Sequence, residues 1–199
     1  MSKQRIAIIP TKVANIASIR AALSRAGFDS QLVHDPEFIY KTPHVVLPGV
    51  GAFQPGMEEL QNLGLTQSVK SRINEGKKIL SICLGMQLLF SSSEEGPGIH
   101  GLGVFEPSVT KFPISVRVPQ FGWNKVHASS KCKLLESGYA YFANSFRIET
   151  APSDTAVATA NYGGDFIAAL EKDGLLACQF HPELSGYWGQ QLIERWLAL

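Results

Sequence analysis

The first ninety residues alternate between apolar, strand-like runs and helix-like segments, and this alternation constrains the fold more than any other feature. Continuous aliphatic runs bounded by polar or turn residues indicate buried strands, whereas apolar residues spaced three and four apart indicate helices. The order is typical of an α/β protein with a mainly parallel, doubly wound central sheet flanked by helices. The predicted strands are 5–9, 31–33, 44–47 and 78–82; the predicted helices are 14–26, stopped by Gly27, and 57–75, a single helix or a pair, capped by Gly76.

The remainder of the chain has a different texture, with short strands separated by turn signals. Residues 91–98 form a polar loop, and the clearest hairpin spans 158–167. A last strand is predicted at 175–180 and a terminal helix at 188–197. We therefore expect an additional region of antiparallel strands, within a single domain that spans residues 1–199.

Composition limits the classes of protein to which this chain can belong. A formal net charge of +1 over 199 residues, with scattered Lys and Arg, argues against a nucleic-acid partner. Three widely spaced cysteines without a Cys-x-x-Cys pair fit a reducing cytosol better than a disulfide-bonded scaffold. The first apolar run is too short for a signal peptide or a membrane span. We expect a cytoplasmic protein with no membrane contact, no metal and no other cofactor.

A cysteine lies where the predicted strand 78–82 gives way to helical spacing. Such a junction presents Cys83 at a helix N-terminus, where the helix dipole favours a thiolate, and Gly85 would leave room for a substrate. Nearly a hundred residues later, His181 and Glu183 offer a base and a carboxylate two positions apart. Together these residues indicate a Cys-His-Glu nucleophilic enzyme. The simpler interpretation is that Cys83 is a small buried hydrophobe and that His181 closes a strand.

Motifs that run in order across almost the whole chain resemble those of the class I, or triad, glutamine amidotransferases. A Cys-Leu-Gly-Met-Gln motif with a distant Phe-His-Pro-Glu is highly specific for this class. The Pro-Gly-Val-Gly and Gly-Trp-Asn segments are more similar to the glutaminase subunits of imidazole glycerol phosphate synthase, an enzyme of histidine biosynthesis. The matching segments are 48–53, 82–90, 93–96, 101–103, 118–119, 122–124 and 179–183.

The resemblance implies thioester chemistry on the side-chain amide of glutamine. Cys83 would attack the amide carbon, His181 would take the thiol proton and protonate the departing ammonia, and Glu183 would orient the imidazole. The oxyanion would be held by the N–H groups of Val50 and Leu84, once a peptide flip in the glycine-rich loop aims the Val50 amide inward. Taken alone, that loop is an ordinary tight turn after a strand.

Positions that would bind glutamine are also carried over by resemblance. They are Gly51, Gln87, Glu95, Ser145 and Phe146. Glu95 would pair with the α-ammonium group, and the backbone of Ser145 and Phe146 would bind the α-carboxylate. Without the resemblance, Glu95 is no more than one member of a solvated pair of loop charges.

A partner protein is implied as well, because a glutaminase acting alone would waste ammonia. The chain has no room for a second catalytic domain, so we expect a heterodimer with a cyclase subunit of (β/α)8-barrel type, which would form imidazole glycerol phosphate and AICAR. One alternative is a paralogous glutaminase that feeds a barrel enzyme amidating a sugar for surface polysaccharide. Two others are a catalytically idle binding module, disfavoured by the intact triad, and a Cys-His peptidase or deglycase, disfavoured by Gln87 and Glu95.

Four departures from the family pattern leave the triad untouched. Residues 10–15 stand where the family commonly has an Asp-Tyr-Gly-x-Gly-Asn stretch; residues 10–14 differ from it, and only Asn15 is kept. Asn144 stands where a His is usual, Phe146 where a Tyr is usual, and Leu184 where a Lys is common. By resemblance, these segments lie around the glutamine site and the face toward the synthase partner, so they bear on which synthase is served.

Overall fold

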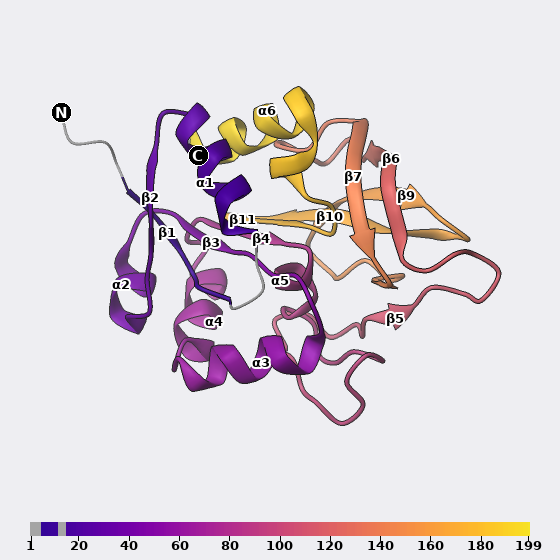
Figure 1. Cartoon of the computed structure of the whole chain (residues 1–199), viewed down its shortest axis with the longest axis horizontal. Helices are drawn as coiled ribbons and strands as arrows, with labels where there is room; N and C mark the ends of the chain where they lie inside the picture. The colour runs from indigo at the N-terminus through magenta and orange to yellow at the C-terminus, as the bar shows by residue number, and fades with distance from the viewer. Residues whose placement is uncertain (1–4, 12–14) are drawn as a thin grey trace.

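A mixed sheet runs through the computed structural model, which describes residues 5–11 and 15–199. Within this part of the chain, nine strands follow the order β2-β1-β3-β4-β11-β10-β9-β6-β7 (Figure 1). The half from β2 to β11 is parallel, and the half from β10 to β7 is antiparallel. The strands are β1 Arg5–Ile8, β2 Asp29–Leu32, β3 Val45–Leu47, β4 Ile79–Ile82, β6 Gln120–Ala128, β7 Gly138–Asn144, β9 Ala156–Asn161, β10 Asp165–Lys172 and β11 Leu175–Cys178, with β5 Thr110–Lys111 and β8 Phe146–Arg147 forming a separate pair.

The helices confirm the α/β prediction and add one helix that it lacked. The helices are α1 Ile16–Arg25, α2 Pro36–Lys41, α3 Phe53–Asn62, α4 Thr66–Asn74, α5 Leu84–Gln87 and α6 Gly186–Leu197, with a 3-10 turn, η1, at Pro182–Leu184. The sequence pattern did not predict α2, because six residues with Ile39 as the one buried position carry no helical period. Its start is nevertheless encoded: the carboxylate of Asp35 accepts from the N–H of Glu37 at 2.9 Å, and Pro36 opens the helix.

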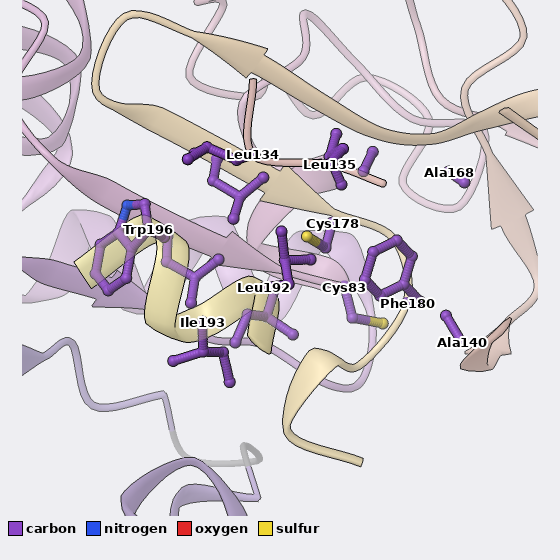
Figure 2. Packing of buried hydrophobic residues seen from close by; sticks show 14 of the residues in the cluster. Cys83, Leu134, Leu135, Ala140, Ala168, Cys178, Phe180, Leu192, Ile193 and Trp196 are labelled. Carbon is purple, nitrogen blue, oxygen red and sulfur yellow. The ribbon is translucent and has the colours of Figure 1, made fainter. Parts of the chain in front are cut away.

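Helices cover both faces of the sheet. Helices α1 and α6 lie against one face, and α2, α3 and α4 lie against the other (Figure 1). Alternating residues of β1, with Ile9 directly after it, contribute to the two layers: Ile6 and Ile8 belong to one buried cluster, and Ala7 and Ile9 to the other. The first cluster continues under the antiparallel strands and includes Cys83 (Figure 2). This arrangement buries the carboxyl ends of β4 and β11 in the middle of the molecule.

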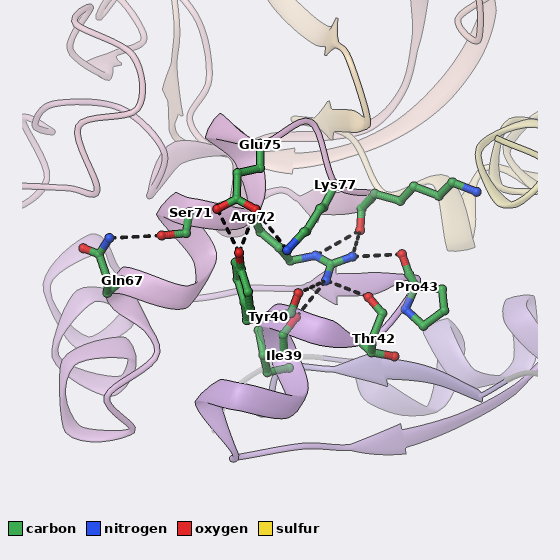
Figure 3. A network of polar contacts seen from close by, with 10 residues as sticks. Ile39, Tyr40, Thr42, Pro43, Gln67, Ser71, Arg72, Glu75 and Lys77 are labelled. Carbon is green, nitrogen blue, oxygen red and sulfur yellow. Dashed lines mark hydrogen bonds and ion pairs between the residues drawn. The ribbon is translucent and has the colours of Figure 1, made fainter.

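A fully buried arginine on α4 fixes where β3 and β4 begin. Arg72 is 0% exposed, and burial lowers its pKa to about 10. Its charge is met by backbone carbonyls at 2.7–3.2 Å, so the donors of one guanidinium tie α4 to the end of α2 and to the starts of two central strands (Figure 3). The carbonyls belong to Ile39, Tyr40, Thr42, Pro43 and Lys78.

Candidate active site

Cys83 occupies a sharp turn between β4 and α5. Its backbone has φ 54° and ψ −110°, a conformation that costs a non-glycine residue free energy and is concentrated at functional sites. Gly85 is required here for a different reason from the one predicted: a Cβ at this position would lie 2.1 Å from the carbonyl oxygen of Leu47, so the glycine lets the turn close against β3. Helix α5 is only four residues long, and its dipole is correspondingly weaker than expected.

The sheet brings His181 next to this turn. Strand β11 lies parallel to β4, with Cys178 opposite Ile82, so both strands deliver the chain to the same edge. The ring Nδ1 of His181 lies 2.9 Å from Oε1 of Glu183, and both side chains are buried. Burial by itself would lower the pKa of His181, but hydrogen bonds and charge from Cys83 and Glu183 outweigh it and raise the pKa to about 10. The three predicted catalytic residues therefore lie together, in surroundings that favour the protonated form of the imidazole.

Ser185, which the sequence reasoning missed, holds the backbone of the histidine. Its hydroxyl donates to the carbonyl of His181 at 2.6 Å and accepts from the N–H of Tyr141 at 3.0 Å. The N–H of His181 in turn donates to the carbonyl of Tyr141 at 2.9 Å. The histidine is thus fixed to β7 as well as to β11, although it lies beyond the end of the last strand.

A chain of side-chain amides connects the cysteine to the predicted glutamine site. Nε2 of Gln179 lies 3.7 Å from Sγ of Cys83, and Oε1 of Gln179 accepts from Gln87 at 2.8 Å. Gln87 also donates to the carbonyl of Phe146 at 3.3 Å, and Asn144 donates to the same oxygen at 2.9 Å. A signal for Gln179 is present in the sequence, since it is an amide that follows an apolar strand and such a group needs partners when buried.

Neither of the two predicted oxyanion donors is available in this conformation. The N–H of Leu84 donates to the carbonyl of Gly49 at 3.2 Å. Because that carbonyl and the N–H of Val50 belong to one peptide unit, the carbonyl faces Cys83 and the Val50 amide points away. A side chain at Gly49 would come within 2.8 Å of the Leu84 Cβ, so glycine permits this close contact.

Glu95, from the segment 91–98, contacts the other end of the loop that carries Gly49 and Val50. Its Oε2 accepts from the N–H of Phe53 at 2.8 Å, at the start of α3, where the N-cap residue Ala52 offers no side-chain hydrogen bond. Burial raises the pKa of Glu95, and the Phe53 N–H opposes this shift. Gly51 is exposed, has a φ of 97°, and lies in the chain between Val50 and the start of α3. The predicted ammonium-binding carboxylate therefore also anchors the loop that carries the predicted oxyanion donor.

The departures from the family pattern fall partly within the described residues. Residues 12–14, with the predicted start of the first helix, lie outside them. The Thr11 hydroxyl donates to the carbonyl of Pro48 at 3.5 Å, and the Asn15 side chain accepts from the N–H of Ser18 at 3.2 Å as the cap of α1. Leu184 is 38% exposed immediately after the triad.

An exposed aromatic face adjoins the site, and the sequence reasoning did not identify it. Residues of odd number on β6 and β7 share one side of the sheet, where Tyr141 contacts both Phe121 and Trp123 with ring centroids 5.8 and 6.2 Å apart. The aromatic face consists of Phe121, Trp123, Tyr139 and Tyr141. The exposed side chains of Leu184 and Tyr187 belong to the neighbouring η1–α6 segment, where a Cβ on Gly186 would lie 3.8 Å from the Trp123 ring. Exposed aromatic side chains of this kind are enriched at protein–protein interfaces.

The fold and this site define a member of a known class. The chain belongs to the class-I glutamine amidotransferase family, whose model matches residues 12–198.

Individual relatives carry names that are more specific than that of the family. The chain is 37% identical over 196 residues to the imidazole glycerol phosphate synthase subunit HisH of Symbiobacterium thermophilum, covering 96% of this chain and 92% of the relative. It is 38% identical over 197 residues to the HisH subunit of Methanothermobacter thermautotrophicus, with 98% of both chains covered.

Solved structures match the fold. A crystal structure described as a glutamine amidotransferase superposes with a TM-score of 0.78 at 20% identity, covering 97% of each chain. The PurLQS structure from Thermotoga maritima superposes with a TM-score of 0.74 at 17% identity over 99% of each chain. At these identities the likeness concerns the fold. In residues 5–11 and 15–199, no helix has the length and apolar character needed to cross a membrane.

Proposed function

We propose that this chain, as one amidotransferase domain over residues 1–199, is the glutaminase subunit of an imidazole glycerol phosphate synthase. It hydrolyses glutamine to glutamate and ammonia and passes the ammonia to a cyclase. The observation that carries this proposal is the buried His181–Glu183 pair, 2.9 Å apart, beside a cysteine held at φ 54° on a strand-to-helix turn. The relatives at 37–38% identity over nearly the full chain supply the pathway.

Cys83 is the nucleophile of the reaction. The sulfur attacks the amide carbon of glutamine, the proton held by His181 passes to the departing amine, and ammonia leaves behind a thioester. Water then attacks the thioester with His181 as base, the carbon–sulfur bond breaks, and glutamate is released. Glu183 keeps Nδ1 of the ring protonated and the ring turned toward the sulfur throughout.

The loop before α3 controls whether the oxyanion is stabilised. The N–H of Leu84 has a single proton, which the Gly49 carbonyl now accepts, so it cannot also serve an oxyanion. Rotation of the peptide between Gly49 and Val50 removes that carbonyl and at the same time aims the Val50 N–H inward. The φ of Val50 is not positive in this conformation. The rotation drives this φ toward positive values, at a cost of about 1–3 kcal/mol. The resting loop is therefore favoured until another interaction offsets this cost.

Glutamine lies between the loop and the β7–β8 segment. Glu95 binds the α-ammonium group with the carboxylate oxygen that does not cap α3, and Gly51 gives the backbone close access to the substrate. The backbone of Ser145 and Phe146 binds the α-carboxylate. Both N–H groups of Gln87 are used within the protein, which leaves its Oε1 to accept from the substrate.

The partner is a cyclase of (β/α)8-barrel type, docked on the aromatic face. This face continues directly from the triad through Leu184, so a barrel seated there receives ammonia without its release to solvent. Large aromatic side chains at the centre of an interface carry most of its binding energy. Three free thiols suit a cytoplasmic location.

The proposed activity is tested by reconstitution with the histidine-pathway cyclase of the same host. Glutamine-dependent formation of imidazole glycerol phosphate, lost in Cys83→Ala, supports the proposal. A paralogous glutaminase serving a sugar-amidating barrel is the alternative, favoured by Leu184 in place of the usual Lys. Failure to bind the cyclase, with tight binding to such a paralogous barrel, would move the assignment to that pathway.

A further inference from the structure

Gln179 is a buried polar residue that the proposed reaction does not use. It is 0% exposed and follows the apolar strand β11. Its amide nitrogen lies 3.7 Å from the sulfur of Cys83. A buried amide is retained in such surroundings only when its hydrogen-bonding capacity is satisfied, and here one of its partners is the reacting atom.

The orientation of this amide follows from the groups at the far end of its network. The carbonyl of Phe146 can only accept, so the two groups that meet it, Nε2 of Gln87 and Nδ2 of Asn144, are both donors. The second N–H of Gln87 then donates to Gln179, whose facing atom must be its oxygen. The remaining end of the Gln179 amide, which carries the N–H groups, is directed at Cys83. A backbone carbonyl thus determines that the sulfur faces a donor.

We propose that Gln179 is a second hydrogen-bond donor to the Cys83 sulfur, which stabilises the thiolate together with His181; the proposal rests on Cys83 being the nucleophile. A hydrogen bond is stronger when its acceptor is an anion than when its acceptor is neutral, so this donor favours the thiolate over the thiol. The effect is exerted twice in the cycle: when the thiolate attacks, and when the carbon–sulfur bond of the thioester breaks and the electron pair returns to sulfur. Gln179 is hydrogen-bonded to Gln87, and Gln87 to the carbonyl of Phe146. Hydrogen bonds therefore link the nucleophile to the segment proposed to bind the α-carboxylate.

Two variants separate a donor role from a structural one. Gln179→Glu keeps an oxygen that accepts from Gln87 but replaces the donor at Cys83 by a second oxygen. Gln179→Met has a similar length and removes both interactions. The measurement is the rate of alkylation of Cys83 by iodoacetamide between pH 5 and 9 in the full chain carrying Cys132→Ser, followed on the Cys83 peptide by mass spectrometry. The matched control is Gln67→Met, an exposed glutamine on α4 that donates to Ser71.

A donor role predicts that alkylation near pH 7 falls about fivefold in Gln179→Met and about tenfold or more in Gln179→Glu, with the pH profile moved to higher pH in both. A purely structural role predicts the opposite order, with Gln179→Glu close to wild type. Wild-type profiles in both variants would also overturn the proposal. If Gln179→Glu does not fold, the shape of the Gln179→Met profile carries the test: a move to higher pH supports a donor role, whereas an equal fall in rate at every pH overturns it. Glutamine hydrolysis by the wild-type complex is measured in parallel: its absence would reject the proposed function, whereas its presence with unchanged profiles would reject only the role of Gln179.

Discussion

His44 provides a pH-dependent stability whose size can be worked out from its surroundings. It lies at the start of β3, 3% exposed, with the ring of Trp196 edge-on at 5.3 Å and that of Phe28 at 6.4 Å. Burial is the largest cause that lowers its pKa, and the charges of Lys78 and Arg72 add to it. The Leu197 backbone acts in the opposite direction, and the pKa is about 4 in place of 6.5. The folded state therefore favours the neutral form of the His44 imidazole.

The sign of the effect follows directly. A group whose pKa is lower in the folded state contributes stability that is fully present above pH 6.5 and is lost as the pH falls toward and through 4. The maximal loss is about 3 kcal/mol, since each pKa unit corresponds to about 1.4 kcal/mol. Linkage distributes this loss as about 2 kcal/mol by pH 5 and about 3 kcal/mol by pH 4.

The assay compares wild type with His44→Leu, which keeps an apolar side chain between the two aromatic rings and cannot be protonated. Free energies of unfolding from urea titrations at pH 7.5, 6, 5 and 4 give the difference between the two proteins at each pH. We expect this difference to shift by about 3 kcal/mol in favour of His44→Leu between pH 7.5 and 4. The control is His34→Leu, which removes an exposed histidine. Parallel pH curves for wild type and His44→Leu would refute the reasoning.

Three further predictions concern the triad, the buried arginine and the docking face. Cys83→Ala should abolish glutamine hydrolysis while circular dichroism shows an intact fold; unfolding would show that the cysteine is structural. His181→Asn should lower kcat about 10³-fold or more and Glu183→Gln should lower it less, because the carboxylate orients the ring without transferring a proton; near-normal turnover of His181→Asn would reject the triad. Arg72→Lys should lower the free energy of unfolding by about 3 kcal/mol in urea titrations, because an ammonium group cannot satisfy five separate carbonyls; a loss below 1 kcal/mol would contradict the network. Leu184→Glu should weaken binding to the cyclase at least tenfold without changing the melting temperature, because the new carboxylate is buried without a partner; unchanged affinity would place the partner elsewhere.

The parallel half of the fold could be predicted because its inner strands, β1, β3, β4 and β11, are buried on both faces. A strand such as 5–9 then appears as a continuous apolar run, which identifies both its type and its depth. The helix after Cys83 was harder: its helical spacing is real, but α5 ends at Gln87 because the next residues turn to pair with another segment. The carbonyl of Leu88 accepts from the N–H of Leu102 at 2.8 Å, and tertiary hydrogen bonding overrides local propensity.

At the site, the motifs located the triad, but not the groups that act on it. Gln179, Asn144 and Ser185 make their contacts across 92, 2 and 44 residues of sequence, and only the sheet order brings the distant pairs together. Gly85 was misinterpreted because a sequence cannot distinguish a glycine that admits substrate from one that admits a neighbouring strand. The bond between Leu84 and Gly49 likewise depends on one peptide orientation, which no residue pattern specifies.

The central claim is that the chain is a triad glutaminase whose oxyanion site is closed by the Gly49 carbonyl until a partner opens it. The most direct test is the steady-state rate of glutamine hydrolysis by the purified chain, alone and with the cyclase and its ligand. The Cys83→Ala variant is the inactive control. We predict a slow isolated chain and an activation of ~100-fold, which corresponds to about 2.7 kcal/mol and lies within the cost of reorienting one peptide. Full activity of the isolated chain would contradict the claim.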